Sequence, residues 1–136
     1  MKLKKSYKGI GLLCLLLIVF IAGICFLPEE IVTAGLITRI IDIFCALWIA
    51  LLTFVIYKTE YVYWYNDITY EDAVKAGSER RKMYAFEHFK RFGGFAAAFT
   101  LFSVIAGYFC VPFWVDMLVL FVGEVYIALS SMRIKL

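Results

Sequence analysis

Four long apolar stretches, separated by shorter charged segments, set the pattern of this chain. They cover residues 10–27, 36–57, 93–111 and 113–132. Each is close to the roughly 20 residues that a helix needs to cross the hydrocarbon core of a bilayer. Only Pro112 separates the last two stretches, and so short a connection is typical of an antiparallel hairpin. The pattern therefore predicts an all-α integral membrane protein, a single domain over residues 1–136 with four transmembrane helices in one bundle.

The first stretch has two possible interpretations. A cleaved signal peptide has an apolar region of only about 7 to 15 residues and small residues at its cleavage site. Residues 10–27 are longer than that, and no such site precedes Pro28. We therefore expect this stretch to remain in the protein as a span, with cleavage as the alternative.

Composition supports the membrane class. Hydrophobic residues make up 64% of the 136 residues, against roughly 45 to 50% in soluble domains. The chain is therefore not a soluble globular protein, and long apolar runs also exclude disorder. We expect a multi-pass protein of the plasma (inner) membrane, whose first partner is the lipid bilayer.

Lysine and arginine predict which way the spans face. Four precede the first span, seven lie in the loop at 58–92, and two follow the last span, so 13 of the 14 share one side. The opposite loops carry Glu29, Glu30 and Asp116 and no cation. By the positive-inside rule, both termini and the central loop are cytoplasmic. The net charge of +3 therefore reflects topology, and we expect no binding to nucleic acid.

The central loop, residues 58–92, is too short to build a core of its own, so we expect it to lean on the membrane or on a partner. The second span is expected to continue as a helix through Tyr65, because no helix breaker comes before Asn66. Thr69 with Asp72 resembles a helix-start signal. Gly77 then predicts the end of a short helix.

A second helix in this loop is expected to begin with Ser78 as its cap and to run into the third span. Aromatic residues alternate there with cations, which is typical of an amphipathic helix at anionic headgroups. A docking site for a partner protein has the same pattern, and so has a basic flank that only anchors the span. The residues concerned are Arg80, Arg81, Lys82, Phe86, Phe89, Lys90 and Arg91.

Glu124 lies near the middle of the fourth span. An ionised carboxylate at that depth costs a few kcal/mol, so it must face other helices, become protonated or find a partner. It is therefore a candidate to carry a proton or bind a cation. The alternative is a protonated side chain that holds the bundle together through Thr53, Ser103 or a backbone carbonyl.

Arg39 and Asp42 stand near the start of the second span with the i, i+3 spacing of a helical pair. If the second and fourth spans touch, these two residues and Glu124 form a small polar cluster. The alternative is that Arg39 extends to the outer headgroups and Asp42 merely compensates its charge.

Signals for redox, metal and enzyme chemistry are weak. The four cysteines include no C-x-x-C pair, although Cys25 and Cys110 lie at the same end of their spans, where a disulfide could form. The only histidine, His88, has no second metal ligand near it in sequence and is expected at the membrane interface. We expect no cofactor, no metal and no catalytic residue.

Two functions remain. The first is a non-catalytic accessory, regulatory or immunity-type component that acts through partner binding in a larger membrane complex. The alternative is a small oligomeric transporter or channel that uses Glu124 as its coupling site. Pairs of small residues spaced four apart in the third span, such as Ser103 with Gly107, predict close helix packing within the chain or between copies.

Overall fold

The computed structural model describes residues 3, 5–26, 33–65 and 68–136. Within them it has four α-helices, one short 3₁₀ helix and no strand, which confirms the all-α class. The elements are α1 Lys8–Cys25, α2 Ala34–Thr59, η1 Val62–Trp64, α3 Tyr70–Tyr108 and α4 Phe113–Ser131. Among the described residues, α2, α3 and α4 are long and apolar enough to cross a membrane, whereas α1 is apolar but shorter. These helices indicate a membrane protein. Glu29, Glu30 and Asn66 lie outside the described residues.

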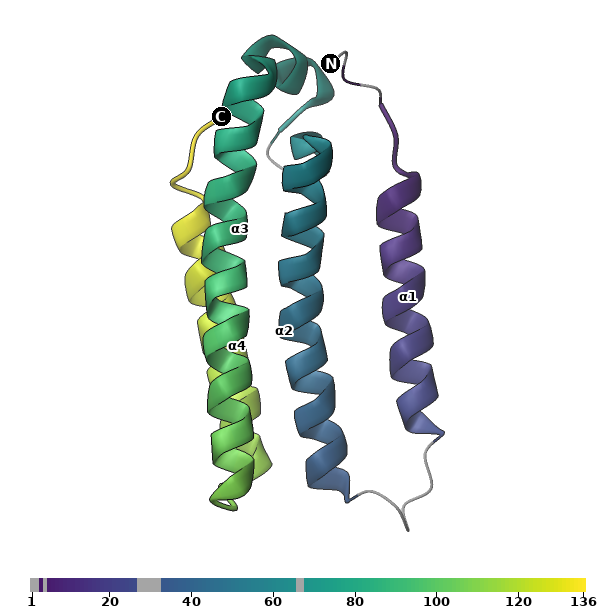
Figure 1. Ribbon diagram of the computed structural model, residues 1–136, viewed down its shortest axis with the longest axis vertical. Coiled ribbons are helices and arrows are strands. Elements are labelled where there is room, and N and C mark those ends of the chain that lie inside the picture. The colour runs from purple at the N-terminus through teal and green to yellow at the C-terminus, as the bar shows by residue number, and fades with distance from the viewer. Residues whose placement is uncertain (1–2, 4, 27–32, 66–67) are drawn as a thin grey trace.

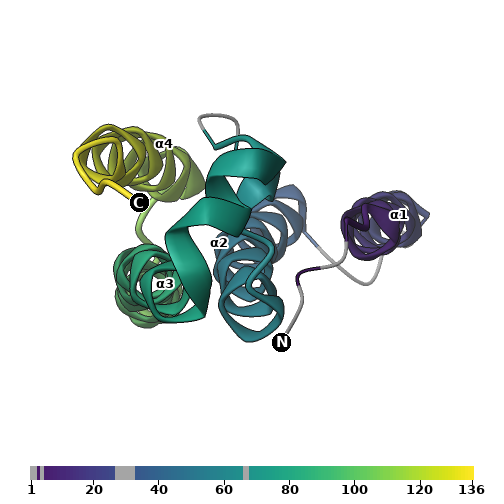
Figure 2. The same ribbon diagram turned by 90° about the horizontal axis from the view of Figure 1, so that it is seen from above.

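Helices α2, α3 and α4 pack as a three-helix bundle, and α1 stands apart on the other side of α2 (Figures 1 and 2). The ring of Phe20 stacks on Phe44, and Trp48 Nε1 donates a hydrogen bond to the Leu13 carbonyl at 3.2 Å. The arrangement differs from the single bundle of four that we expected. The physical reason is that α1 is apolar beyond its first residue, so lipid can solvate its other faces at no cost.

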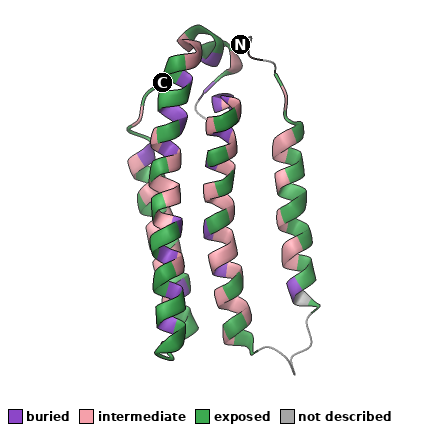
Figure 3. Cartoon of the chain, in the orientation of Figure 1, coloured by how far each residue is buried: buried purple, intermediate pink, exposed green. Residues whose placement is uncertain are grey.

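The intramembrane core lies between α2 and α3. Ala46 and Ala96 are each 1% exposed and Phe99 is 2% exposed, because two alanines allow the helix axes to approach closely. Figure 3 shows that α1, in contrast, is exposed or intermediate over almost its whole length. Helix α4 joins α3 where the Phe95 ring lies over Gly123, a position at which a Cβ would collide with the ring.

Beyond the bundle, residues 60–65 and 68–77 form a compact segment, which we call the cap. Helix α2 ends at Thr59 because Glu60 adopts a left-handed conformation with φ 60°. The expected continuation of this helix through Tyr65 is therefore wrong. Thr69 does begin the next helix as predicted, since its Oγ1 accepts a hydrogen bond from the Asp72 amide at 3.1 Å. Gly77, with φ 79° and ψ 166°, breaks that helix as predicted.

The cap has a small core, which the loop alone could not have supplied. Val62, Ala73 and Ala85 are fully buried, and Ile56 from the end of α2 is 1% exposed. Three partly buried residues from the two chain termini pack against them, namely Leu3, Ile134 and Leu136. The loop therefore packs against the two ends of the chain, which the length of the loop did not predict.

Candidate functional site

Arg39 on α2 forms the centre of a polar cluster inside the bundle. Its Nη1 donates to Asp116 Oδ2 at 2.7 Å and to the Ser103 carbonyl at 3.1 Å, while Nη2 donates to the Val111 carbonyl. Asp116 is completely buried and also accepts a hydrogen bond from the Ser103 hydroxyl. One guanidinium thus joins α2 to α3 and to the start of α4.

The predicted partners of Arg39 are wrong. The sequence suggested a pair with Asp42 or extension to the headgroups, whereas the observed carboxylate is Asp116, 77 residues away. Asp116 lies in the first turn of α4, where a carboxylate is favoured by the helix dipole. Charge counting had assigned it to an outer loop. The missed signal was an acid in the first turn of the last span, at the same end of the bundle as Arg39.

Two acidic side chains of the spans are left without a bonded cation. Asp42 is 8% exposed, and its Oδ2 has no hydrogen-bond partner among the described residues. Glu124 is half-buried and makes no hydrogen bond or ion pair in the described part of the chain. Asp42 lies three residues before Cys45 on α2, and α2 contacts α4, which carries Glu124.

The structure also bears on the alternative roles for Glu124. The Thr53 hydroxyl donates to the Ala50 carbonyl and the Ser103 hydroxyl donates to Asp116. Neither hydroxyl therefore donates to Glu124; a protonated Glu124 that itself donates to Thr53, Ser103 or a backbone carbonyl stays a prediction. The expected cluster of Arg39, Asp42 and Glu124 is not joined by hydrogen bonds or ion pairs among the described residues, where Arg39 binds Asp116 instead.

These two carboxyl groups define what the site can do. A buried carboxylate without donors is costly, so each group must be neutral or must meet a cation or donor from outside the described residues. A proton, a metal ion or a basic side chain of another helix could satisfy them. The described residues contain no group of three His, Cys, Asp or Glu side chains placed to hold a metal ion.

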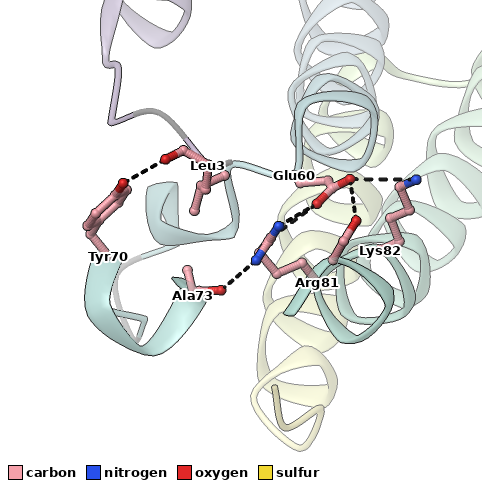
Figure 4. Close-up of polar contacts among 7 residues, drawn as sticks. Leu3, Glu60, Tyr70, Ala73, Arg81 and Lys82 are labelled. Carbon is pink, nitrogen blue, oxygen red and sulfur yellow. Dashed lines mark hydrogen bonds and ion pairs between the residues drawn. The ribbon is translucent and has the colours of Figure 1, made fainter. Parts of the chain in front are cut away.

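A second arginine cluster holds the cap (Figure 4). Arg81 donates from Nη2 to Glu60 Oε2 at 2.8 Å, from Nε to the same oxygen at 3.2 Å, and from Nη1 to the Ala73 carbonyl at 2.9 Å. Ser78, the expected helix cap, instead donates its hydroxyl to Glu60 Oε1 at 2.8 Å. Arg81 is 4% exposed, so its prediction as a surface docking residue is wrong.

Glu60 is buried, but donors and cations surround its carboxyl group. Burial by itself raises the pKa of its carboxyl, but the hydrogen bonds from Ser78 and Arg81 and the charges of Arg81 and Lys82 outweigh that effect. The pKa of Glu60 therefore lies below its ordinary value of 4.5. The cap thus depends on an ionised carboxylate at the end of α2.

The expected amphipathic helix runs along the axis of the bundle. Residues 78–92 continue straight into the predicted span (Figure 1), so they cannot lie flat on the headgroups while that span crosses the membrane. The Phe89 ring packs against Phe54 and Tyr57 of α2, and Phe86, though 43% exposed, packs against Tyr57. The aromatic stripe therefore serves helix packing.

Apart from the buried Arg81, the cations of residues 78–92 divide into two groups. Arg80, Lys82 and Lys90 are exposed, with Lys90 held near Glu87 at 3.0 Å. Arg91 is half-buried and donates to the Ser130 carbonyl at 2.5 Å, which fixes α3 to the end of α4. Only the exposed group offers charge to a lipid surface or a partner.

Aromatic side chains fasten the N-terminal segment to the cap. The Tyr70 hydroxyl donates to the Leu3 carbonyl at 2.7 Å (Figure 4), and Trp64 Nε1 donates to the Ser6 carbonyl at 3.0 Å. The Tyr63 hydroxyl accepts from the Ser6 amide at 2.8 Å. These contacts were not predicted, because aromatic residues near the end of a span are also typical of anchors at the membrane interface.

The remaining predictions concern His88 and the cysteines. His88 is 5% exposed, with Nδ1 bonded to the Tyr84 carbonyl at 3.0 Å, so the chain itself covers it. Its expected place at the membrane interface stays a prediction. The Cys110 thiol is free. The side chain of Cys25, its suggested partner, lies outside those that the structure describes.

Comparison of this chain with protein-family models, with curated proteins and with solved structures finds no match to any of them. Any function must therefore be argued from the side chains described above.

Proposed function

We propose that this chain is a four-span protein of the plasma (inner) membrane, with both termini and the cap in the cytoplasm. The distribution of lysine and arginine supports this orientation. So does the cap, in which segments near both chain ends contact the loop that joins α2 to α3. Helix α1 is counted as the first span because it runs beside α2 (Figure 1).

Its function, in this proposal, is that of a non-catalytic accessory or regulatory subunit that binds a partner within the membrane. The observation that supports it is the pair Asp42 and Glu124. The one cation of the spans, Arg39, is already bound to Asp116, so these two acids need a group from elsewhere. A basic side chain on a partner helix would supply it, and such pairs are a recognised use of intramembrane charge.

The position of α1 supports the same proposal. Among the helices of the described chain, α1 packs chiefly on α2 (Figure 2), which leaves α4 uncovered on the side away from α3. A partner helix that lay beside α4 there would reach Glu124. The exposed Arg80, Lys82 and Lys90 would meanwhile face anionic headgroups, whose attraction is about 1 kcal/mol for each cation near the surface.

An oligomeric transporter or channel is the second candidate. The half-buried state of Glu124 favours it, because a coupling carboxyl must be reachable from a path as well as shielded from bulk water. In that case the group that meets Glu124 would come from a second copy of this chain or from the transported ion.

The test is mild extraction of a tagged chain from native membranes, followed by mass determination of the complex. We expect a second protein at fixed stoichiometry, which is lost in Glu124→Gln and retained in the control Glu87→Gln, an exposed carboxylate. A complex made only of copies of this chain would support the transporter. An isolated chain in both cases would contradict both functions.

A further inference from the structure

A cavity of about 510 Å³ lies between α2, α3 and α4, next to the cap. The cavity lies toward the end of the bundle that carries the cap, since Thr53 is in the last third of α2 and Ser131 ends α4. The volume is within the range of about 300–1,000 Å³ that small-molecule sites occupy. Neither of the two proposed functions uses this cavity.

Polar groups meet in this cavity. Ser131 is 5% exposed, and its Oγ is buried without a hydrogen-bond partner among the described residues. Thr53 and His88, which are 2% and 5% exposed, also line the wall. A buried hydroxyl that lacks a partner is uncommon in native proteins, and a ligand that hydrogen-bonds to it is one explanation.

Apart from the Tyr65 hydroxyl, the rest of the wall is apolar, and it carries no formal charge. Leu52, Phe92 and Met132 contribute hydrocarbon and aromatic surface, and no Asp, Glu, Lys or Arg lines the cavity. An ionised headgroup would therefore be desolvated here without a counter-charge, which is costly. Water could meet the polar end of the cavity, but along the apolar wall it finds no hydrogen-bond partner. The wall fits an uncharged molecule with a polar head and an apolar body.

We propose that this cavity binds a neutral lipid, from the leaflet at the cap end of the bundle, through the hydroxyl or carbonyl oxygens of its head. The head hydrogen-bonds with Ser131, and the acyl chain follows the apolar wall out between the helices. The site is distinct from Asp42 and Glu124, and it would exist whether or not the chain binds a protein partner.

The experiment reconstitutes the whole chain in nanodiscs with a monoacylglycerol that carries a photoreactive diazirine in its chain. A fatty acid with the same diazirine, ionised at neutral pH, is the matched probe. We expect the monoacylglycerol to label peptides from the cavity wall in α2 and α4, and unlabelled monoolein to compete with it. The fatty acid should label these peptides several-fold less.

Variants sharpen the test. Ala128→Phe fills the cavity from its wall and should abolish the specific labelling, whereas the control Leu129→Phe, on the outward side at 61% exposed, should leave it unchanged. Ser131→Ala should weaken competition by monoolein about two- to tenfold. Its control is Ser130→Ala, because the Ser130 hydroxyl already donates to the Ile127 carbonyl at 2.9 Å.

The proposal is overturned by any of three results. These are no wall labelling that monoolein reduces, equal labelling by the fatty acid, and unchanged labelling in Ala128→Phe. If Ala128→Phe fails to fold, as judged by its elution profile, the comparison of Ser131→Ala with Ser130→Ala decides.

Discussion

Arg39 and Arg81 each hold a shielded carboxylate by an ion pair, in different surroundings. Arg39 and Arg81 each bind one carboxylate and at least one backbone carbonyl of another segment. The partner of Arg39 is Asp116, fully buried at a helix start inside the bundle, whereas Glu60 ends a helix at the edge of the bundle. The Asp116 side chain is 0% exposed and that of Glu60 is 9% exposed, so water reaches a broken pair more readily at Glu60. The Arg81–Glu60 pair should therefore tolerate disruption better than the Arg39–Asp116 pair.

The largest effect is expected at Arg39 and Asp116. Arg39→Leu or Asp116→Leu leaves an uncompensated charge in the bundle and should lower the free energy of unfolding by about 3–5 kcal/mol. The double variant should recover most of that loss, because it removes both charges. Reversible unfolding in detergent measures all three. Additive losses in the double variant would mean that the pair does not act as a unit.

A smaller loss is expected at Arg81. Arg81→Ala removes its bonds to Glu60 and to the Ala73 carbonyl, and hydrogen bonds to charged groups contribute about 1.5–3 kcal/mol. The same unfolding assay measures the loss of unfolding free energy in Arg81→Ala. Arg80→Ala, at the exposed neighbouring position, should stay within about 0.5 kcal/mol. Equal effects of the two variants would contradict the assignment of Arg81 to the cap.

Gly77 shapes the turn that brings Ala73 to Arg81. Its φ of 79° and ψ of 166° fall in a region that only glycine adopts freely, so Gly77→Ala should cost about 1–3 kcal/mol. Faster amide exchange in the cap reports the loss. Gly94→Ala is the matched control, because an added Cβ there meets nothing within 4 Å. No difference between the two would show that the turn is not strained.

The smallest effect is a pH dependence confined to the cap. The pKa of Glu60 is lower in the folded chain than its ordinary value of 4.5. Its contribution to the stability of the cap is therefore complete above pH 4.5 and is lost as pH falls through the folded pKa. Trp64 fluorescence follows the cap during acidification. Glu60→Gln should remove the dependence in this range. If the fluorescence of Glu60→Gln changed by the same amount during acidification, the titrating group would be another residue.

Local rules predicted the features that depend on neighbouring residues. The apolar stretches, the start at Thr69 and the break at Gly77 all follow from side chains within a few positions. The end of α2 did not, because nothing in the residue type marks Glu60 for a left-handed conformation. That conformation coincides with bonds to Ser78 and Arg81, which lie 18 and 21 residues further along the chain.

The charged residues of the candidate site also divide into those that local sequence predicts and those that only the fold brings together. A spacing of three along a helix suggested Asp42 as the partner of Arg39, but only the fold brings Asp116 from the last span. Likewise, a run of cations in an amphipathic pattern does not reveal that Arg81 faces inward while Arg80 faces outward. A carboxyl group in an apolar run is visible in the sequence alone, and on that ground Glu124 stays a predicted site residue.

The most direct test of the proposed partner binding is photo-crosslinking beside Glu124 in native membranes. Phe121 is 70% exposed and lies three residues before Glu124, so replacing it with benzoylphenylalanine keeps an aromatic side chain at this position. We expect one discrete adduct with a second membrane protein, which disappears when Glu124→Gln is added. An adduct that persists in Glu124→Gln, or labelling of lipid alone, would contradict the proposal that this carboxyl group meets a basic side chain of a partner.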